Sequence, residues 1–319
     1  MTDTRLPLRS DSLVDPVVVH RRNADTVFLT GVQPSGTGGY VATAVAPDDH
    51  PYYAAHTAEG NRRLDPMLLL EACRQGLIYL GHTVCEAPLD TRFLLDTCAL
   101  DISADAYRGL PATGACELTM AVLDVAAQRT GRRVRSLAPV FALSAGDVQI
   151  GRVEVGASLA SPAAYAALRQ RGRSGPPSYS DELPDPDRAG AVPPAEVGRV
   201  DPADVLLADL RTTGDGAEAR VLVPGGHAGL FDHPLDHIPG SLLVEAARQL
   251  GTTMSPKPAD AVMTGMTAVF HAFAELEVPV QLRARTATAD NEVVVTARQG
   301  DTEVATVTVR TRGQQASYL

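Results

Sequence analysis

The sequence predicts an α+β protein built from two copies of one domain, each an antiparallel sheet wrapped around a single apolar helix. One observation is residues 231–249, FDHPLDHIPGSLLVEAARQ, where an acid and a base interrupt an otherwise apolar helical stretch. Another is a similar stretch earlier in the chain, residues 64–75, LDPMLLLEACRQ. Their glutamates are 174 residues apart, which indicates duplication of a whole domain rather than a solenoid repeat. Runs of β-branched and aromatic residues around both stretches are typical of strands.

Each copy should contain one helix that is buried nearly all round, because almost no polar face remains. In the first copy Asp65 and Pro66 suit the cap and first turn, and Gly81 suits the end. In the second copy Pro239 suits the first turn and Gly251 the exit, so the helix should span residues 240–250. Both helices carry a glutamate, an arginine three residues later and a glutamine four residues later. At this spacing all three side chains project from one side of the helix. The matched residues are Glu71, Arg74 and Gln75 in the first copy and Glu245, Arg248 and Gln249 in the second.

The remaining elements read as strands separated by turn-forming residues. Residues 1–20 look like a loose arm without chemistry. In the first half we expect a hairpin of residues 26–30 and 40–46, then strands at 93–103, 116–125, 134–143 and 148–159, and a short helix at 163–170. In the second half we expect strands at 204–210, 219–223, 263–278, 281–288, 292–298 and 302–310. Residues 100–102 align with 276–278 at an offset of 176, which extends the repeat downstream.

A change of composition marks the domain boundary. Residues 172–202 hold seven prolines and almost no large apolar residue, so this segment is expected to be an extended linker without a core. The predicted division is a first domain of residues 1–170, a linker of residues 171–202 and a second domain of residues 203–319.

Charge and cysteine content exclude several classes of protein. The chain has 28 basic and 38 acidic residues, a net charge of −10, which argues against a nucleic-acid-binding surface. Its four cysteines lie in the first half without a CxxC pair, so we expect neither a disulfide scaffold nor a zinc site, and no cofactor is called for. The first fifteen residues are mixed polar and charged, unlike a signal peptide, and no apolar run could span a membrane. We therefore expect a cytoplasmic protein that does not bind membranes.

These motifs resemble a known family. One buried helix per antiparallel sheet, preceded by a histidine and containing a glutamate, resembles the hotdog fold, and residues 51–56, PYYAAH, resemble the histidine-bearing approach of β-hydroxyacyl-ACP dehydratases. The closer similarity is to the A-factor biosynthesis hotdog family, the γ-butyrolactone autoregulator synthases, whose signature resembles FDHPLDHIPG and LLVEAARQ. The resemblance covers roughly residues 20–165 and 195–319. It implies a tandem hotdog protein.

The resemblance also implies an activity: transfer of a β-ketoacyl group from an acyl carrier protein thioester to the hydroxyl of dihydroxyacetone phosphate. Such a reaction needs a base, donors for an oxyanion and a binder for phosphate. Helix N-termini near Met67 and Ser241 offer free N–H groups. The predicted catalytic residues are Glu71, Arg248, His56 and Glu245. The predicted substrate-binding residues are Arg74, Arg62, Arg63, His233, Gln75 and Gln249.

Since double hotdogs commonly form one active site where the halves meet, we expect Glu71 to act with Arg248, and Arg248 to hold the phosphate as a bidentate fork. Burial would raise the pKa of Glu71 or Glu245 and a nearby arginine would lower it, with a net result that the sequence does not give. No metal site is expected, because the histidine and aspartate spacing of residues 232–237 is weak evidence for one.

Other interpretations remain open. Each Glu–Arg pair could merely neutralise a buried helix, although a buried ion pair is often no more stable than apolar residues. His233 and His237 could cap the helix or bond the backbone. The protein could instead be an acyl-ACP or acyl-CoA dehydratase or thioesterase, or a non-catalytic acyl-binding regulator. A double hotdog could be a monomer or a homodimer.

Overall fold

The computed structural model describes residues 13–36, 38–54, 64–110, 114–171, 173, 175–214, 216–258, 261–287 and 292–313. In the first half its elements are the 3-10 helices η1 (Pro16–Val19) and η2 (Ala24–Thr26), the strands β1 (Leu29–Pro34), β2 (Tyr40–Ala46), β3 (Arg92–Ile102), β4 (Cys116–Thr130), β5 (Arg133–Ala145) and β6 (Val148–Ala160), and the helices α1 (Pro66–Thr83), α2 (Ala104–Arg108) and α3 (Pro162–Gln170). The rest of the chain forms the 3-10 helices η3 (Ser180–Glu182), η4 (Pro194–Val197) and η5 (Pro202–Asp204), the strands β7 (Leu207–Thr213), β8 (Gly216–Val221), β9 (Ala261–Phe270), β10 (Gln281–Thr286), β11 (Glu292–Gln299) and β12 (Thr302–Gly313), and helix α4 (Gly240–Thr253).

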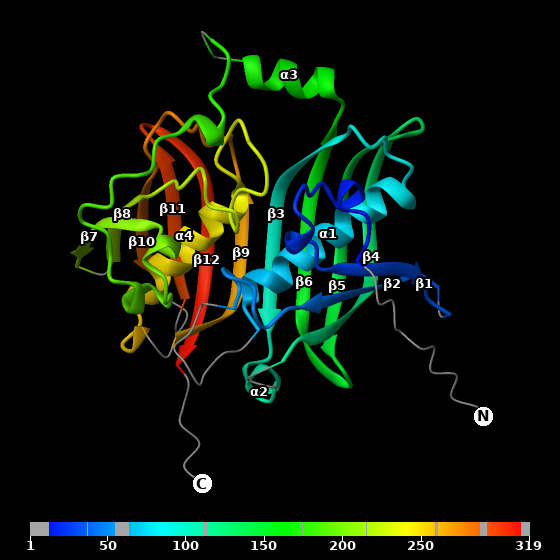
Figure 1. The fold of residues 1–319 in the computed structure, drawn as a ribbon, viewed down its shortest axis with the longest axis horizontal. Coiled ribbons are helices and arrows are strands. Elements are labelled where there is room, and N and C mark those ends of the chain that lie inside the picture. The colour runs from blue at the N-terminus through cyan, green and yellow to red at the C-terminus, as the bar shows by residue number, and fades with distance from the viewer. Residues whose placement is uncertain are drawn as a thin grey trace.

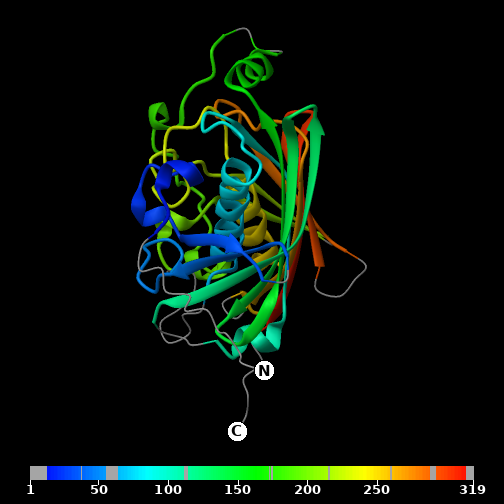
Figure 2. The same cartoon turned by 90° about the vertical axis from the view of Figure 1, so that its right-hand side faces the viewer.

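The described strands make one antiparallel sheet of twelve, in the order β1-β2-β4-β5-β6-β3-β9-β12-β11-β10-β8-β7. The order is symmetrical about the pair β3–β9, which joins the halves in register from Thr97↔Val269 to Asp101↔Gly265. Figures 1 and 2 show α1 and α4 on the same face of this curved sheet, each covering the strands of its own half. The prediction of one helix on one antiparallel sheet per half, joined edge to edge, is confirmed.

Both long helices begin where the sequence predicts and end later. Asp65 caps α1 by accepting a 2.8 Å bond from the N–H of Met67, and Pro66 is its first residue. The predicted ends at Gly81 and Gly251 are wrong, because both glycines lie inside helices that continue to Thr83 and Thr253. A Cβ on Gly81 would come within 2.6 Å of the Phe93 ring, so this glycine serves the close approach of α1 to β3.

The repeat differs from the predicted one at both ends. Strand β9 stops at Phe270, so residues 276–278, which we aligned with strand residues 100–102, lie in the following turn and are not their equivalents. Upstream, the two copies share a motif that the sequence analysis missed. A 3-10 helix ends in a left-handed residue, His20 (φ 54°) or Gly198 (φ 67°), and an arginine and a second capped 3-10 helix follow, all at an offset of 178.

This repeated motif bears on the predicted linker and arm. Val197 and Arg199, near the end of predicted linker 171–202, are buried against α4, and Val19, in the predicted arm, is buried against α1. Neither segment is only a tether. The predicted domain boundary at residue 203 stays a prediction. The repeated motif of the second copy begins at η4.

Within the described residues, none of the helices has the length and apolar character needed to cross a membrane.

Candidate active site

The first carboxylate cluster consists of Arg21, Glu71, Arg74 and Gln75. Glu71 Oε2 accepts a 2.8 Å bond from Nε of Arg74, and Oε1 accepts from Arg74 Nη2 (3.1 Å), Gln75 Nε2 (2.8 Å) and Arg21 Nε (3.2 Å). Gln75 also bonds the backbone of Thr26 and Phe28, which ties α1 to the start of β1. The predicted Glu–Arg–Gln grouping therefore exists, with a second arginine from outside the helix.

The second carboxylate cluster repeats this arrangement with Arg199, Glu245, Arg248 and Gln249. Glu245 accepts from Arg248 (2.8 and 2.7 Å), Gln249 (2.7 Å) and Arg199 Nε (3.0 Å). Arg199 Nη2 lies 2.9 Å from Glu245 Oε1, without the alignment of a hydrogen bond. Gln249 bonds the backbone of Asp204 and Leu206, as Gln75 does at the equivalent positions.

The two clusters differ in exposure. In the second, the side chains of Glu245 and Arg199 are fully buried and that of Arg248 is 6% exposed. Tyr52 closes part of it, since its carbonyl accepts from Arg199 (3.0 Å) and its ring lies 4.2 Å from the guanidinium. In the first, the side chain of Arg74 is 26% exposed and that of Arg21 is 15% exposed. Solvent and small molecules thus reach the first cluster more readily.

Both glutamates are held as carboxylates. Burial would raise the pKa of Glu71, but Arg21 and Arg74 outweigh burial and lower it to about 2. Arg199 and Arg248 lower the pKa of Glu245 to about 2 in the same way against the effect of burial. A carboxylate with so low a pKa is a weak base at neutral pH.

A central cavity of about 610 Å³ lies between the halves, beside the first cluster. Glu71, Arg21 and Arg74 line it from the first half. Residues 229, 230 and 232–241, from the loop before α4 and its first turn, line it from the second. Its apolar lining includes side chains from the strand β3, the helix α4 and the end of β9: Phe93, Leu94, Leu95, Leu243 and Phe270. The cavity thus joins a polar region to an apolar one.

The loop before α4 brings two aspartate-bound imidazoles to this cavity. His233 Nδ1 lies 3.2 Å from Asp232, and His237 Nδ1 lies 2.7 Å from Asp236. Bonds to both aspartates outweigh the effect of burial and lower the pKa of each carboxyl, so both stay charged at neutral pH. A neutral imidazole that donates Nδ1–H to a carboxylate keeps the lone pair of Nε2 available.

Each aspartate is itself anchored. Asp232 accepts from the N–H groups of Arg22 (2.7 Å) and Asn23 (3.0 Å) and the hydroxyl of Thr26 (2.6 Å), which fixes the loop of the second half against the first. Asp236 accepts from the Tyr165 hydroxyl (2.5 Å) and from Arg169 Nε (3.1 Å), both on α3. The connection between the halves therefore positions the loop.

The two helix N-termini differ. The first N–H groups of α1 are partly satisfied by Asp65, whereas Pro239 caps α4 without any side-chain bond. Gly240 and Ser241, at the start of α4, line the central cavity. The free N–H groups of this first turn are suited to bind an oxyanion.

The predicted site residues fall into three groups. Glu71, Arg74 and Gln75 lie together beside the cavity that His233 also lines. Arg248 bonds Glu245 in the second cluster rather than Glu71, and the lining of the central cavity includes neither Arg248 nor Gln249. His56, Arg62 and Arg63 lie outside the described residues. The predicted roles themselves stay predictions.

The sequence analysis missed Arg21 and Arg199. Each bonds the glutamate of its own half, and the offset of 178 between them was a usable signal. The helices match at 174, so the four extra residues between Arg21 and Glu71 concealed the equivalence.

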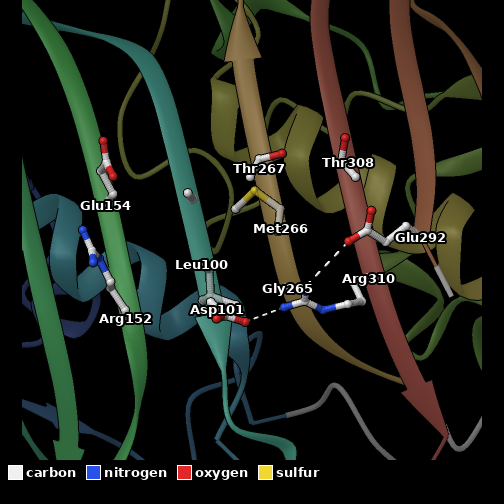
Figure 3. A pocket seen from close by; sticks show the side chains of 11 residues that line it. Leu100, Asp101, Arg152, Glu154, Gly265, Met266, Thr267, Glu292, Thr308 and Arg310 are labelled. Carbon is white, nitrogen blue, oxygen red and sulfur yellow. Dashed lines mark hydrogen bonds and ion pairs between the residues drawn. The ribbon is translucent and has the colours of Figure 1, made fainter. Parts of the chain in front are cut away.

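A second hollow lies on the opposite, open face of the sheet at the β3–β9 junction (Figure 3). Arg310 crosses it from β12, pairing with Asp101 of the first half and lying 3.6 Å from Glu292. Gly265 makes room, since a Cβ there would meet the Arg310 guanidinium at 2.5 Å. The ion pair between Arg310 and Asp101 joins the two halves here, on the other side of the sheet from the carboxylate clusters.

Solved structures of similar shape have low sequence identity. A crystal structure titled as a fusion DH domain aligns with a TM-score of 0.50 at 15% identity, covering 93% of this chain and 96% of that one. The 12:0-ACP thioesterase from Umbellularia californica gives 0.50 at 11%, covering 86% and 98%. At this identity the likeness concerns the fold alone, and it agrees with the predicted double hotdog.

Comparison of the sequence with known proteins identifies the family as well as the fold. A synthase of Streptomyces virginiae named 2-oxo-3-(phosphooxy)propyl 3-oxoalkanoate synthase is 31% identical over 95% of this chain and 98% of its own length. Its namesake in Streptomyces coelicolor is 30% identical over 85% and 81%. The model of the A-factor biosynthesis hotdog domain matches residues 2–161 and 180–313. The chain therefore belongs to the A-factor biosynthesis hotdog family.

Proposed function

We propose that the protein transfers a β-ketoacyl group from a thioester to the hydroxyl of dihydroxyacetone phosphate, forming a 2-oxo-3-(phosphooxy)propyl 3-oxoalkanoate. The relatives at about 30% identity carry the name of this synthase. The observation that carries the proposal is the central cavity, because it combines a charged cluster, two oriented imidazoles, an uncapped helix N-terminus and an apolar wall.

The reaction exchanges one bond for another. The hydroxyl oxygen attacks the thioester carbonyl, the new C–O bond forms, the C–S bond breaks, and the hydroxyl proton passes through a base to the leaving thiolate. The base must be unprotonated at neutral pH and yet basic enough to accept a proton. Imidazole meets both requirements better than a carboxylate whose pKa is about 2.

We assign the base to His233. Its partner Asp232 is fixed to the residues that follow Arg21, so this imidazole lies on the side of the cavity nearest the first cluster. Glu71 then acts indirectly: it holds the guanidinium groups of Arg21 and Arg74 at the cavity wall. This differs from the expectation that Glu71 itself is the base.

The N-terminus of α4 supplies the oxyanion donors in this scheme. The N–H groups of Gly240 and Ser241 lack intrahelical acceptors, and they carry the positive end of the helix dipole. Negative charge on the thioester oxygen in the transition state would be stabilised there. The apolar residues beyond it would accommodate the acyl chain.

We further propose that acyl carrier protein delivers the acyl group. The family resemblance supports this donor, and a comparison of carrier-bound and CoA-bound thioesters with the same acyl chain tests it.

The test of the activity is a product assay. The purified protein is incubated with a 3-oxoacyl thioester and dihydroxyacetone phosphate, and products are identified by mass spectrometry. A phosphorylated ester that requires both substrates is expected. Free 3-oxo acid without ester would indicate a thioesterase, and loss of water from a 3-hydroxyacyl thioester would indicate a dehydratase; either result without ester contradicts the proposal. Dihydroxyacetone without phosphate serves as the control acceptor.

A further inference from the structure

Three cationic or basic side chains from three different elements line the central cavity, and the scheme above gives none of them a substrate group to bind. His20 ends η1, Arg74 lies on α1 and Arg92 begins β3. The two arginines have N–H groups that no described residue accepts. Arg74 uses Nε and Nη2 on Glu71, and no described residue bonds its Nη1. Arg92 forms no ion pair within the described residues, and its guanidinium lies 6.0 Å from the Tyr165 ring.

The first cluster therefore carries excess positive charge toward the cavity. Glu71 supplies one negative charge, and Arg21 alone would neutralise it. Arg74 and Arg92 add two more positive charges. The cavity lining also holds three aspartates, but each of them has its own partner: Asp232 bonds His233, Asp236 bonds His237 and Asp96 bonds Ser158. This local excess of positive charge favours an anion, which would meet the exposed guanidinium of Arg92 and the partly buried one of Arg74.

His20 is held by a second histidine. Its Nε2 lies 2.9 Å from Nε2 of His82, while Nδ1 of His82 lies 2.9 Å from the carbonyl of Ala87 and must donate to it. One of the two Nε2 atoms must carry the hydrogen that joins the two rings. The Phe93 ring packs edge-on against both imidazoles. This arrangement fixes the orientation of His20.

The second copy lacks this arrangement. Gly198 occupies the position of His20, and a Cβ there would lie 3.5 Å from Nη1 of Arg248, the counterpart of Arg74. In the first copy the charge of Arg74 acts on His20, in agreement with the same relative placement there. Only the copy that borders the cavity carries the imidazole.

We propose that Arg74, Arg92 and His20 form the subsite for the phosphate of the three-carbon acceptor, a phosphate monoester dianion. This assignment rests on the proposed function for the identity of the acceptor. Two guanidinium groups can offer paired N–H donors to phosphate oxygens, which lysine cannot reproduce. The subsite lies in the first half, whereas Arg248 was the residue expected to hold the phosphate.

Proton uptake is a consequence. The titratable and charged side chains that face His20 are His82 and Arg74 on α1 and Arg92 on β3, and the backbone of Leu89 also bonds this ring. Burial together with these groups lowers the pKa of His20 to about 4, so the ring is neutral at pH 7 in the empty site. A bound dianion attracts the charged form of His20 and raises its pKa, so phosphate binding should draw a proton onto His20.

The test measures binding of glycerol 3-phosphate, without thioester, by calorimetry at pH 7 in two buffers of different ionisation enthalpy. The wild-type protein should bind with net proton uptake. Arg92→Gln should weaken binding ten- to a hundredfold, the usual effect of losing hydrogen bonds to a charged group. His20→Asn, which tolerates the left-handed backbone at this position, should weaken binding and abolish proton uptake.

Arg152→Gln, which removes one exposed charge from the opposite face of the sheet, is the matched control and should bind as the wild type does. The KM for dihydroxyacetone phosphate is the second readout, and it should rise in Arg92→Gln while the KM for the thioester changes little. The proposal is overturned if neither quantity responds to Arg92→Gln, or if Arg152→Gln has the same effect. Ester formation with an unchanged acceptor KM would refute the subsite alone, and phosphate binding without ester formation would refute the function alone.

Discussion

Replacing each cluster glutamate by glutamine separates a catalytic from a structural role. Glu245→Gln leaves Arg199 fully buried and Arg248 6% exposed, without the carboxylate that both contact. Asp65, 3.5 Å from Arg199, is then the remaining buried carboxylate. Removing one partner of a buried ion pair costs about 3–5 kcal/mol. At about 2–4 °C per kcal/mol, the melting temperature should fall by roughly 6–20 °C.

Glu71→Gln should behave differently. Its partners Arg74 and Arg21 are 26% and 15% exposed, so water offsets part of the lost pairing and we expect a cost of about 1–3 kcal/mol. Turnover should fall by about 10², because Arg21 and Arg74 lose the group that holds them at the cavity wall, and small misplacements have effects of this size.

The assay pairs thermal denaturation with steady-state turnover, measured well below the lower melting temperature. Glutamine keeps the shape of the side chain in both variants, so each serves as the control for the other. The reasoning is refuted if Glu245→Gln loses turnover at an unchanged melting temperature while Glu71→Gln retains both, because the second cluster would then be the working site.

Three further predictions concern packing, acid stability and the base. Gly81→Ala should lower the free energy of unfolding by about 1–3 kcal/mol, because its Cβ would meet Phe93 at 2.6 Å. Gly251→Ala, whose Cβ would come no closer than 3.4 Å to Val309, should leave stability unchanged or raise it slightly. Chemical denaturation of both variants measures the difference. The pKa values of Glu71 and Glu245, both about 2 against an ordinary 4.5, are depressed by folding, so their stabilisation is present above pH 4.5 and is lost as pH falls toward 2. The melting temperature of the wild type should fall as pH is lowered from 4.5 to 2, and that of Glu71→Gln should fall less. An equal dependence of the melting temperature on pH in both proteins would contradict the lowered pKa of Glu71. His233→Gln should lower turnover by about 10²–10⁴ with little change in melting temperature, and a similar loss only in His237→Gln would move the base to His237.

The helices and their polar residues were predictable because the signal is local. A capped apolar stretch with an acid, an arginine and a glutamine at fixed spacing gives the same cluster in both halves. The strands followed from β-branched runs, although β9 is shorter than its apolar pattern because residues 271–280 turn away from the sheet.

What the sequence did not reveal depends on contacts between distant segments. Arg21 and Arg199 reach their glutamates across 50 and 46 residues. Arg21 directly follows the predicted arm, and Arg199 lies in the predicted linker. Whether a cluster faces a cavity depends on what covers it, and Tyr52 covers the second cluster. The spacing of residues along the sequence does not encode that difference. The expected pairing of Glu71 with Arg248 therefore rested on the family resemblance and the matched motif positions.

The central claim is that the working site is the cavity between the halves beside Glu71. A crystal structure with a stable 3-oxoacyl thioether analogue of the donor tests it most directly. We predict the analogue's carbonyl near the N-terminus of α4, its chain along the apolar wall formed by Phe93, Leu95 and Phe270, and His233 within reach of the reacting carbon. An analogue bound beside Glu245 and Arg248, with the central cavity empty, would contradict the claim.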